Sequence, residues 1–245
     1  MSIEVPFLQD GEIEQEADGL IAEYCREQSK KVVKEPPVPI EDLVELHLQL
    51  IFEFKDLHQE LGFPDIHGAI WVNERRIAID NQLDPQLYPA KRGRYHFTLA
   101  HETGHWRLHR KYFIKRDERH LFEGAAAPPD FIGRSGNRNR VEVQANQFAA
   151  CLLMPRQLVR QEWEHWHGDL DSLYLDDLGD RRGELLRAEI TRRGSAKPGP
   201  EGEADMLLEH LSRPMAERFH VSPEAMRYRL EACGLLGAKR PATLF

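Results

Sequence analysis

Two histidines and a glutamate near the middle of the sequence have the spacing of a metal-assisted catalytic site. His101 and His105 enclose Glu102 in the pattern His-Glu-x-x-His. On a helix, residues four apart lie on one face, so both imidazoles can point at the same ion. Glu102 is turned by about 100° from His101, which puts it beside the ion rather than on it. A carboxylate placed there can take a proton from water, so the pattern suggests hydrolysis.

A third ligand is needed, because a catalytic zinc site normally takes three protein side chains and leaves one position for water. Glu142 offers a carboxylate further along the chain, and Asn146, one turn later, can hold a neighbouring ligand by a hydrogen bond. His109 competes for the role of third ligand. It would follow His105 along the same helix, which suits a tetrahedral site badly, so we expect His109 to support the site without binding the ion. Histidine and carboxylate donors suit Zn²⁺, and also Mn²⁺ or Co²⁺.

The ligands are expected on two helices that pack closely. One helix carries the His-Glu-x-x-His pattern, and Glu142 lies on a second, downstream helix. That second helix should end at Pro155, because the residue before a proline avoids helical angles. Its small residues Ala145 and Ala149 would let the two helices approach each other. Burying these ionisable groups without a metal would be costly, which favours a metal site over a packed core.

The remaining pattern predicts an α+β order of elements. Apolar periodicity predicts further helices, and alternation predicts short strands with a hairpin turn at 73–75. The helices are expected at 12–28, 40–47 and 157–167, and the last helix should be capped by Ser222. The strands are expected at 50–55, 68–72 and 76–80, with a possible fourth at 130–133.

Composition limits the classes of protein to which this sequence can belong. It has 245 residues and a net charge of −8, which argues against a broadly basic nucleic-acid binder. Its three cysteines, Cys25, Cys151 and Cys233, are scattered and indicate reduced thiols. No apolar run approaches the roughly 20 residues of a membrane span, and the N-terminus lacks the features of a signal peptide. We therefore expect a cytoplasmic protein that does not act at a membrane.

Two motifs together resemble the ImmA/IrrE family of metallo-endopeptidases. The first spans 94–106, RYHFTLAHETGHW, and the second spans 144–155, QANQFAACLLMP. The stretch 216–230 is similar to the helix-turn-helix segment that closes members of this family. The paired motifs are specific, whereas the C-terminal stretch alone would be a weak sign.

The resemblance implies a role for each candidate residue. His101 and His105 match the two metal histidines of the family, Glu102 its catalytic glutamate and Glu142 its glutamate ligand. The chain departs from the family at Thr103, where an aliphatic residue is more usual, and in a longer connection before Glu142. Neither departure removes a catalytic group.

The fold implied by the resemblance is a zincin-like core, in which a small antiparallel sheet packs on the two ligand helices. We expect four parts in the chain. These are an N-terminal helix and linker (1–39), the metallopeptidase core (40–167), a charged linker or insertion (168–205) and a helix-turn-helix-like segment (206–245).

Substrate handling can be predicted only in outline. The strand pair between Gly68 and Asp80 could offer an edge on which an extended peptide adds as a further strand. His109, His67 and Tyr95 are candidates for stabilising the oxyanion, and the sequence does not choose among them. The long polar connection 111–140 is a candidate gate, although it could equally be a solvated loop.

These features lead to one main functional hypothesis and one rival. The first is a zinc-dependent endopeptidase that cleaves an intracellular protein at a specific site. The resemblance implies a helix-turn-helix repressor as substrate, since family members act on DNA-binding repressors. The rival is a regulatory DNA- or protein-binding module with a structural metal, in which Arg227, Tyr228 and Arg229 lie on a recognition helix. The acidic net charge disfavours direct DNA binding.

Overall fold

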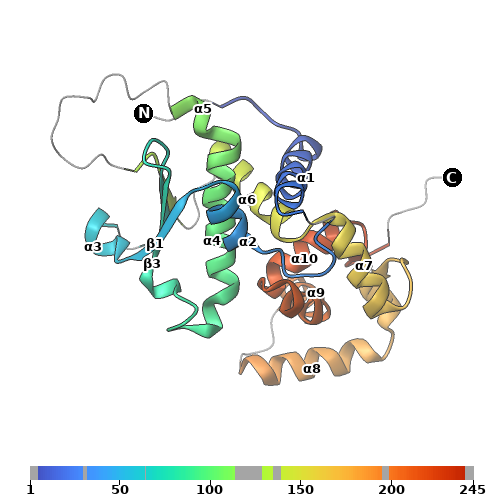
Figure 1. The fold of residues 1–245 in the computed structure, drawn as a ribbon. Helices are drawn as coiled ribbons and strands as arrows, with labels where there is room; N and C mark the ends of the chain where they lie inside the picture. Colours follow the sequence, from blue (N-terminus) through green and yellow to red (C-terminus); the bar gives the residue numbers. More distant parts are fainter. Residues whose placement is uncertain are drawn as a thin grey trace. The chain divides into compact units, whose positions relative to one another are not determined.

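A computed structural model describes residues 5–29, 32–63, 65–113, 129–134, 139–194 and 199–240 of the chain. The chain divides into two compact units, Met1–Pro155 and Arg156–Phe245. It combines a small sheet with many helices (Figure 1), which confirms the predicted α+β class. The four-part division of the sequence stays a prediction.

The first unit contains a four-stranded mixed sheet. Its strands are β1 (Ile51–Lys55), β2 (Ile66–Trp71), β3 (Arg76–Asp80) and β4 (Phe131–Arg134), in the order β1-β3-β2-β4. Strand β2 is antiparallel to both of its neighbours, whereas β1 runs parallel to β3. The four predicted strands are confirmed to within two residues.

Two sequence-based predictions about this sheet are wrong. The sheet is not purely antiparallel, because helix α3 (Leu57–Leu61) lies in the connection from β1 and the chain returns so that β3 pairs parallel to β1. The hairpin β2–β3 also offers no edge, because β1 and β4 pair with its two sides. Alternation identifies a strand, but it does not specify which neighbour the strand pairs with.

The first unit also contains the helices predicted at 12–28 and 40–47, whereas the helix predicted at 157–167 lies in the second unit. Helix α1 (Asp10–Glu27) and the short α2 (Ile40–Asp42), which continues into the π-helical turn η1 (Leu43–His47), precede the sheet. The 3₁₀ turns η2 (Asn81–Leu83) and η3 (Pro89–Lys91) follow β3 and lead into α4 (Arg92–Gly104). Helix α4 continues through the π-helical turn η4 (His105–His109) into α5 (Arg110–Phe113), and α6 (Arg140–Leu153) follows β4.

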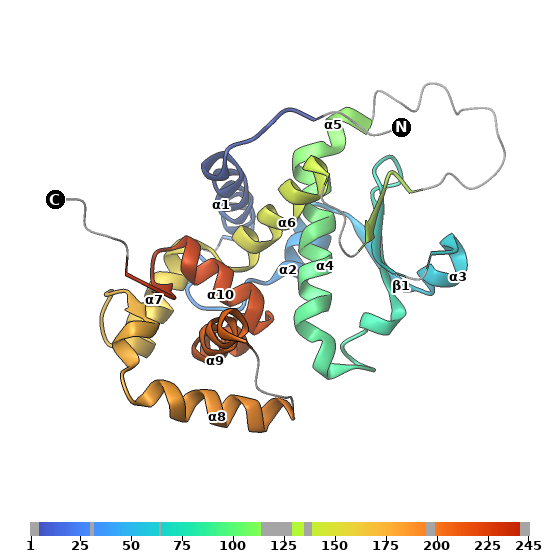
Figure 2. The same cartoon turned by 180° about the vertical axis from the view of Figure 1, so that it is seen from behind.

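Helices α4 and α6 lie side by side in both views (Figures 1 and 2). A β-carbon added to Gly104 would lie only 3.2 Å from Ala145 Cα and 3.1 Å from the Phe148 ring. The glycine on one helix and the alanine on the other therefore permit the close approach that the small residues predict. Ala145, Phe148 and Ala149 are fully buried, so this contact belongs to the apolar core.

The second unit is mainly helical. It contains α7 (Arg156–His167), η6 (Leu175–Leu178), α8 (Arg181–Arg193), α9 (Pro200–Phe219) and α10 (Pro223–Ala232). Two short strands, β5 (Leu173–Tyr174) and β6 (Leu236–Gly237), pair in parallel. The Ser222 side chain accepts a hydrogen bond from the Ala225 N–H at 3.1 Å, which confirms the predicted cap of the last helix.

Helix α8 lies within the segment 168–205 that the sequence suggests to be a charged linker. Its Glu189 is fully buried and accepts hydrogen bonds from Arg192 and Arg193 on the same helix and from Arg213 on α9. These partners hold the pKa of Glu189 far below its ordinary value, Arg192 contributing most. A segment rich in charge can thus pack as a helix when buried ions are paired.

No helix in the described part of the chain is both long and apolar enough to cross a membrane.

Candidate metal centre

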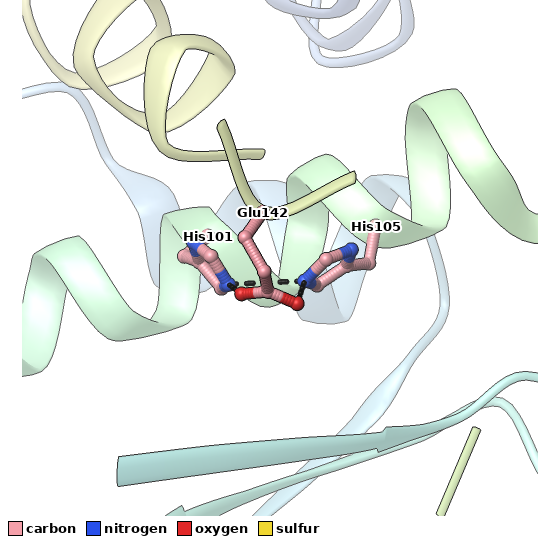
Figure 3. A group of neighbouring side chains, drawn as sticks. All are labelled: His101, His105 and Glu142. Atoms are coloured by element: carbon pink, nitrogen blue, oxygen red, sulfur yellow. Dashed lines mark hydrogen bonds and ion pairs between the residues drawn. The ribbon is translucent and has the colours of Figure 1, made fainter. Parts of the chain in front are cut away.

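Three buried side chains converge on one point in the first unit (Figure 3). His101 Nε2 lies 3.0 Å from His105 Nε2 and 3.2 Å from Glu142 Oε2, and His105 Nε2 lies 3.5 Å from Glu142 Oε1. His101 is 6% exposed, His105 0% and Glu142 4%. The structure therefore brings together all three residues that the sequence suggests as ligands.

The local structure explains how these side chains meet. His101 lies in the last turn of α4 and His105 opens η4, so the four-residue spacing stacks the two imidazoles on one face. Glu142 lies in the first turn of α6, where Asn139 caps the helix and its Oδ1 accepts a hydrogen bond from the Glu142 N–H at 3.0 Å. The positive end of the helix dipole also favours a carboxylate there.

Each histidine is held from behind by a further side chain. His101 Nδ1 lies 2.9 Å from Asn146 Oδ1, and an amide oxygen only accepts, so the Nδ1–H donates to it. In the neutral form of His101, Nε2 then carries a lone pair that faces Glu142, and in the protonated form the Nε2–H donates to that carboxylate. His105 Nδ1 lies 3.2 Å from His109 Nδ1. Asn146 and His109 thus lie where the sequence suggests supporting residues.

Phe131, at the start of β4, is a neighbour of the site that the sequence analysis misses. Its ring stacks on the imidazole of His105 at 4.0 Å with an angle of 11° between the planes. The sequence predicts a strand here but gives no sign of which face it buries. Gln144, within the second motif, is also missed; it lies 3.0 Å from His109 Nε2.

The geometry of the donors fits a divalent cation. Atoms about 2.0–2.1 Å from an ion in a tetrahedral site lie about 3.3 Å from one another. The two imidazole nitrogens lie 3.0 Å apart, and each lies near one Glu142 oxygen, His101 3.2 Å from Oε2 and His105 3.5 Å from Oε1, which are separations close to that value. When His101 is neutral, its Nε2 lone pair and the Glu142 carboxylate have nothing to donate to each other, so a cation would satisfy both.

A comparison with known families identifies the domain that contains this cluster. Residues 64–184 match the family model Peptidase_M78, described as the IrrE N-terminal-like domain. The chain carries an M78 peptidase domain. This match confirms the resemblance to the ImmA/IrrE family, and a comparison with curated proteins found no match. M78 is a metallopeptidase family, and His101, His105 and Glu142 all lie within the matched residues.

Glu102 of the M78 domain is a fully buried carboxylate. It is 0% exposed, and neither carboxylate oxygen has a hydrogen-bond partner among the described residues. Burial raises the pKa of Glu102 to about 8; the charge of His101 opposes this rise and that of Glu142 adds to it. An acid whose pKa lies near neutral pH, beside a candidate metal site, is suited to exchanging protons.

The two candidate ligand histidines have different electrostatic environments. Burial lowers the pKa of His101, but its hydrogen bond with Glu142 and the charge of Glu102 outweigh burial and leave the pKa raised. Burial, together with neighbouring His101 and His109, lowers the pKa of His105 well below its ordinary value. His105 is therefore a neutral imidazole, the form that binds metals.

The backbone of β2 makes room for the Glu102 side chain. A β-carbon on Gly68 would lie 2.7 Å from Glu102 Oε1 and 2.8 Å from Thr98 Cγ2. No other residue type fits at position 68 unless Glu102 moves. The strand pattern predicts β2 but gives no reason for a glycine at this position.

The remaining sequence-based candidates lie in different surroundings. The Tyr95 hydroxyl donates a hydrogen bond to Glu41 at 2.8 Å, which argues against a role at the oxyanion. His67, on β2, is half-buried, and burial together with Arg94 lowers its pKa. The candidate gate at 111–140 falls largely on residues 114–128 and 135–138, which lie outside the described residues.

Proposed function

We propose that this chain is a zinc-dependent endopeptidase with a zincin-like core. His101, His105 and Glu142 would hold the ion, and Glu102 would act as the catalytic base. The observation that carries the proposal is the convergence of three buried acceptor atoms next to a buried carboxylate that has no hydrogen-bond partner among the described residues. The M78 domain match supports the same reaction class.

The residues of the chain have separate roles in this proposal. A bound zinc ion would lower the pKa of water to about 7 and polarise the scissile carbonyl. Glu102 accepts a proton from the attacking water and passes it to the leaving amine. Asn146 and His109 hold the imidazoles of His101 and His105 so that both Nε2 atoms face the Glu142 carboxylate. Burial of all three candidate ligands limits competing water at the site.

Strand β4 is the edge that we propose for the substrate. It is an outer strand of the sheet in the described part of the chain, and its Phe131 stacks on His105. A peptide added beside β4 would lie along the metal centre and be held through backbone hydrogen bonds. The affinity of such a peptide would come from its main chain, and its side chains would supply the specificity.

The proposed substrate is an intracellular DNA-binding repressor. This choice rests on the family resemblance, since ImmA/IrrE proteins act on repressors that are often encoded beside them. Cleavage at one site would then relieve repression. A protease of this kind must avoid general digestion of its surroundings, so we expect it to degrade unfolded proteins slowly.

The rival function, a DNA-binding module with a structural metal, finds less support. Arg227 and Arg229 on α10 are 5% and 6% exposed, and Arg227 pairs with Asp205. Of the three residues expected on a recognition helix, only Tyr228 is exposed. A structural zinc would also require a fourth protein ligand, and the metal cluster found among the described residues has three.

Two variants test the proposal. Purified protein should contain about one zinc-like ion per chain, and His101→Ala should lose it while the fold is kept. His165→Ala, at an exposed position on α7, is the matched control and should retain the metal. Glu102→Gln should keep the ion and lose about two to four orders of magnitude in rate. Full metal content in His101→Ala, or full activity in Glu102→Gln, would refute the assignment.

A further inference from the structure

A chain of three hydrogen bonds connects the N-terminal segment to the candidate ligand His105. Gln144 Nε2 lies 2.9 Å from the Pro6 carbonyl oxygen, and Gln144 Oε1 lies 3.0 Å from His109 Nε2. His109 Nδ1 in turn lies 3.2 Å from His105 Nδ1. The three linked side chains are buried, with exposures of 3%, 1% and 0% in that order. Water therefore does not substitute for the two inner contacts, which join Gln144 to His109 and His109 to His105.

The direction of each hydrogen bond follows from the carbonyl at the far end. A backbone carbonyl only accepts, so the amide nitrogen of Gln144 must face Pro6 and its oxygen must face His109. His109 Nε2 therefore bears the proton and donates it to Gln144. A neutral imidazole has one N–H, so Nδ1 of His109 is an acceptor and Nδ1 of His105 must donate to it.

At the end of this chain of hydrogen bonds, His105 has the tautomer that can bind a metal. With its proton on Nδ1, His105 has a lone pair on Nε2, the atom that faces His101 and Glu142. In the opposite tautomer, an N–H would point at the place where an ion would lie. We propose that Gln144 and His109 are positioning residues that select the metal-binding tautomer of His105, with the Pro6 carbonyl fixing the orientation of Gln144.

The N-terminal segment is held at this place by α6 itself. Val5 is 4% exposed, and its carbonyl accepts a hydrogen bond from Arg140 Nη1 at 3.1 Å. Arg140 and Gln144 are four residues apart on α6, so one face of the helix binds two successive carbonyls of the segment. The segment before α1 is thus part of the support of the metal centre, and it lies far from His105 in the sequence.

The inference rests on the proposed metal site, but its first test needs no metal. Nitrogen-15 NMR of the histidine side chains in the metal-free full-length protein distinguishes a proton on Nδ1 from one on Nε2. Wild type should show His105 protonated on Nδ1 and His109 on Nε2. The opposite tautomer of His105 in wild type would overturn the proposal, whether or not the protein binds metal.

Substitutions at Gln144 separate positioning from packing. Gln144→Met keeps the length of the side chain but removes both hydrogen bonds, and it should lose the preference for the Nδ1–H tautomer of His105. Gln144→Glu still offers an oxygen acceptor to His109 and should retain that tautomer. Gln147→Met makes the same change at a half-buried position on the same helix and should resemble wild type.

Metal affinity provides the second measurement. Zinc binding measured by competition with a chelator should be about 10–100-fold weaker in Gln144→Met than in wild type and Gln147→Met. An unchanged affinity together with an unchanged tautomer in Gln144→Met would overturn the proposal. If no variant binds metal but the wild-type tautomer is as predicted, the hydrogen-bond chain stands and the peptidase proposal fails.

Discussion

At the scale of single residues, the space left by Gly68 determines where the proposed base lies. The Glu102 carboxylate occupies the volume in which any side chain at position 68 would begin. Gly68→Ala should displace Glu102 while leaving the proposed ligands His101 and His105 in place. Because a misplacement of about 1 Å can cost about 100-fold in rate, we expect a loss of that order with metal content unchanged.

The control for this substitution is another glycine-to-alanine change. A β-carbon on Gly11 in α1 would meet no atom within 4 Å, so Gly11→Ala should leave the rate unchanged. Activity on a peptide substrate and metal content of both variants provide the comparison. Equal rates in the two variants would mean that β2 yields to the extra methyl group and does not fix the base.

Glu102 also gives the metal-free protein a specific pH dependence. Burial raises its pKa from 4.5 to about 8 in the folded state. Between these values the folded protein keeps a proton that the unfolded chain loses. The contribution of Glu102 to the free energy of unfolding is therefore complete below pH 4.5 and is lost as the pH rises through 8. The slope is at most about 1.4 kcal/mol per pH unit.

Glu102→Gln removes the titrating group and tests this dependence. The free energy of unfolding of the variant minus that of wild type should increase as the pH rises across this range. Urea denaturation in the presence of a chelator, repeated at several pH values, measures the difference. A difference that does not change with pH would contradict a raised pKa for Glu102.

At the scale of elements, the cap of α6 positions the first turn, from which Glu142 reaches the site. Asn139 accepts a hydrogen bond from the Glu142 N–H, which otherwise lacks an acceptor within the helix. Asn139→Ala should lower the free energy of unfolding of the metal-free protein by about 1 kcal/mol. Asn139→Asp keeps a capping oxygen and should lose only a fraction of this, as measured by urea denaturation.

The elements differ in how much of them the sequence reveals. The two ligand helices are predictable because their apolar periodicity is local and because His101, His105 and Glu142 each follow a recognisable spacing or motif. The order β1-β3-β2-β4 is not, because pairing depends on residues far apart in the chain. The stacking of Phe131 on His105 depends on that same long-range pairing.

The residues that support the candidate site are also predictable from the sequence only in part. Asn146 is predictable because it lies one helical turn from Glu142. The link from Pro6 to Gln144 is not, because the segment before α1 has no periodicity and its carbonyl carries no side-chain signal. Helix α8 is hard to predict because its sequence is highly charged. Only the fold reveals that Glu189 is buried among arginines.

At the scale of the whole molecule, the net charge of the protein affects which substrates it attracts. The chain is acidic overall, with a net charge of −8, so a substrate with a basic DNA-binding surface would be attracted to it over long range. That attraction is screened by salt. Cleavage of a repressor should therefore slow as ionic strength rises, whereas cleavage of a short neutral peptide should change little.

The direct test incubates the metal-loaded protein with the DNA-binding repressor proposed as its substrate, sought among the proteins encoded beside it. One cut should form, identified by sequencing the fragments, and the same digest with Glu102→Gln should leave the repressor intact. Casein, an unfolded substrate, should be cut slowly or not at all, because a peptide must fit beside β4 and next to the centre formed by His101, His105 and Glu142. An intact repressor alongside rapid digestion of casein would instead indicate a housekeeping peptidase, whose site accepts any extended chain.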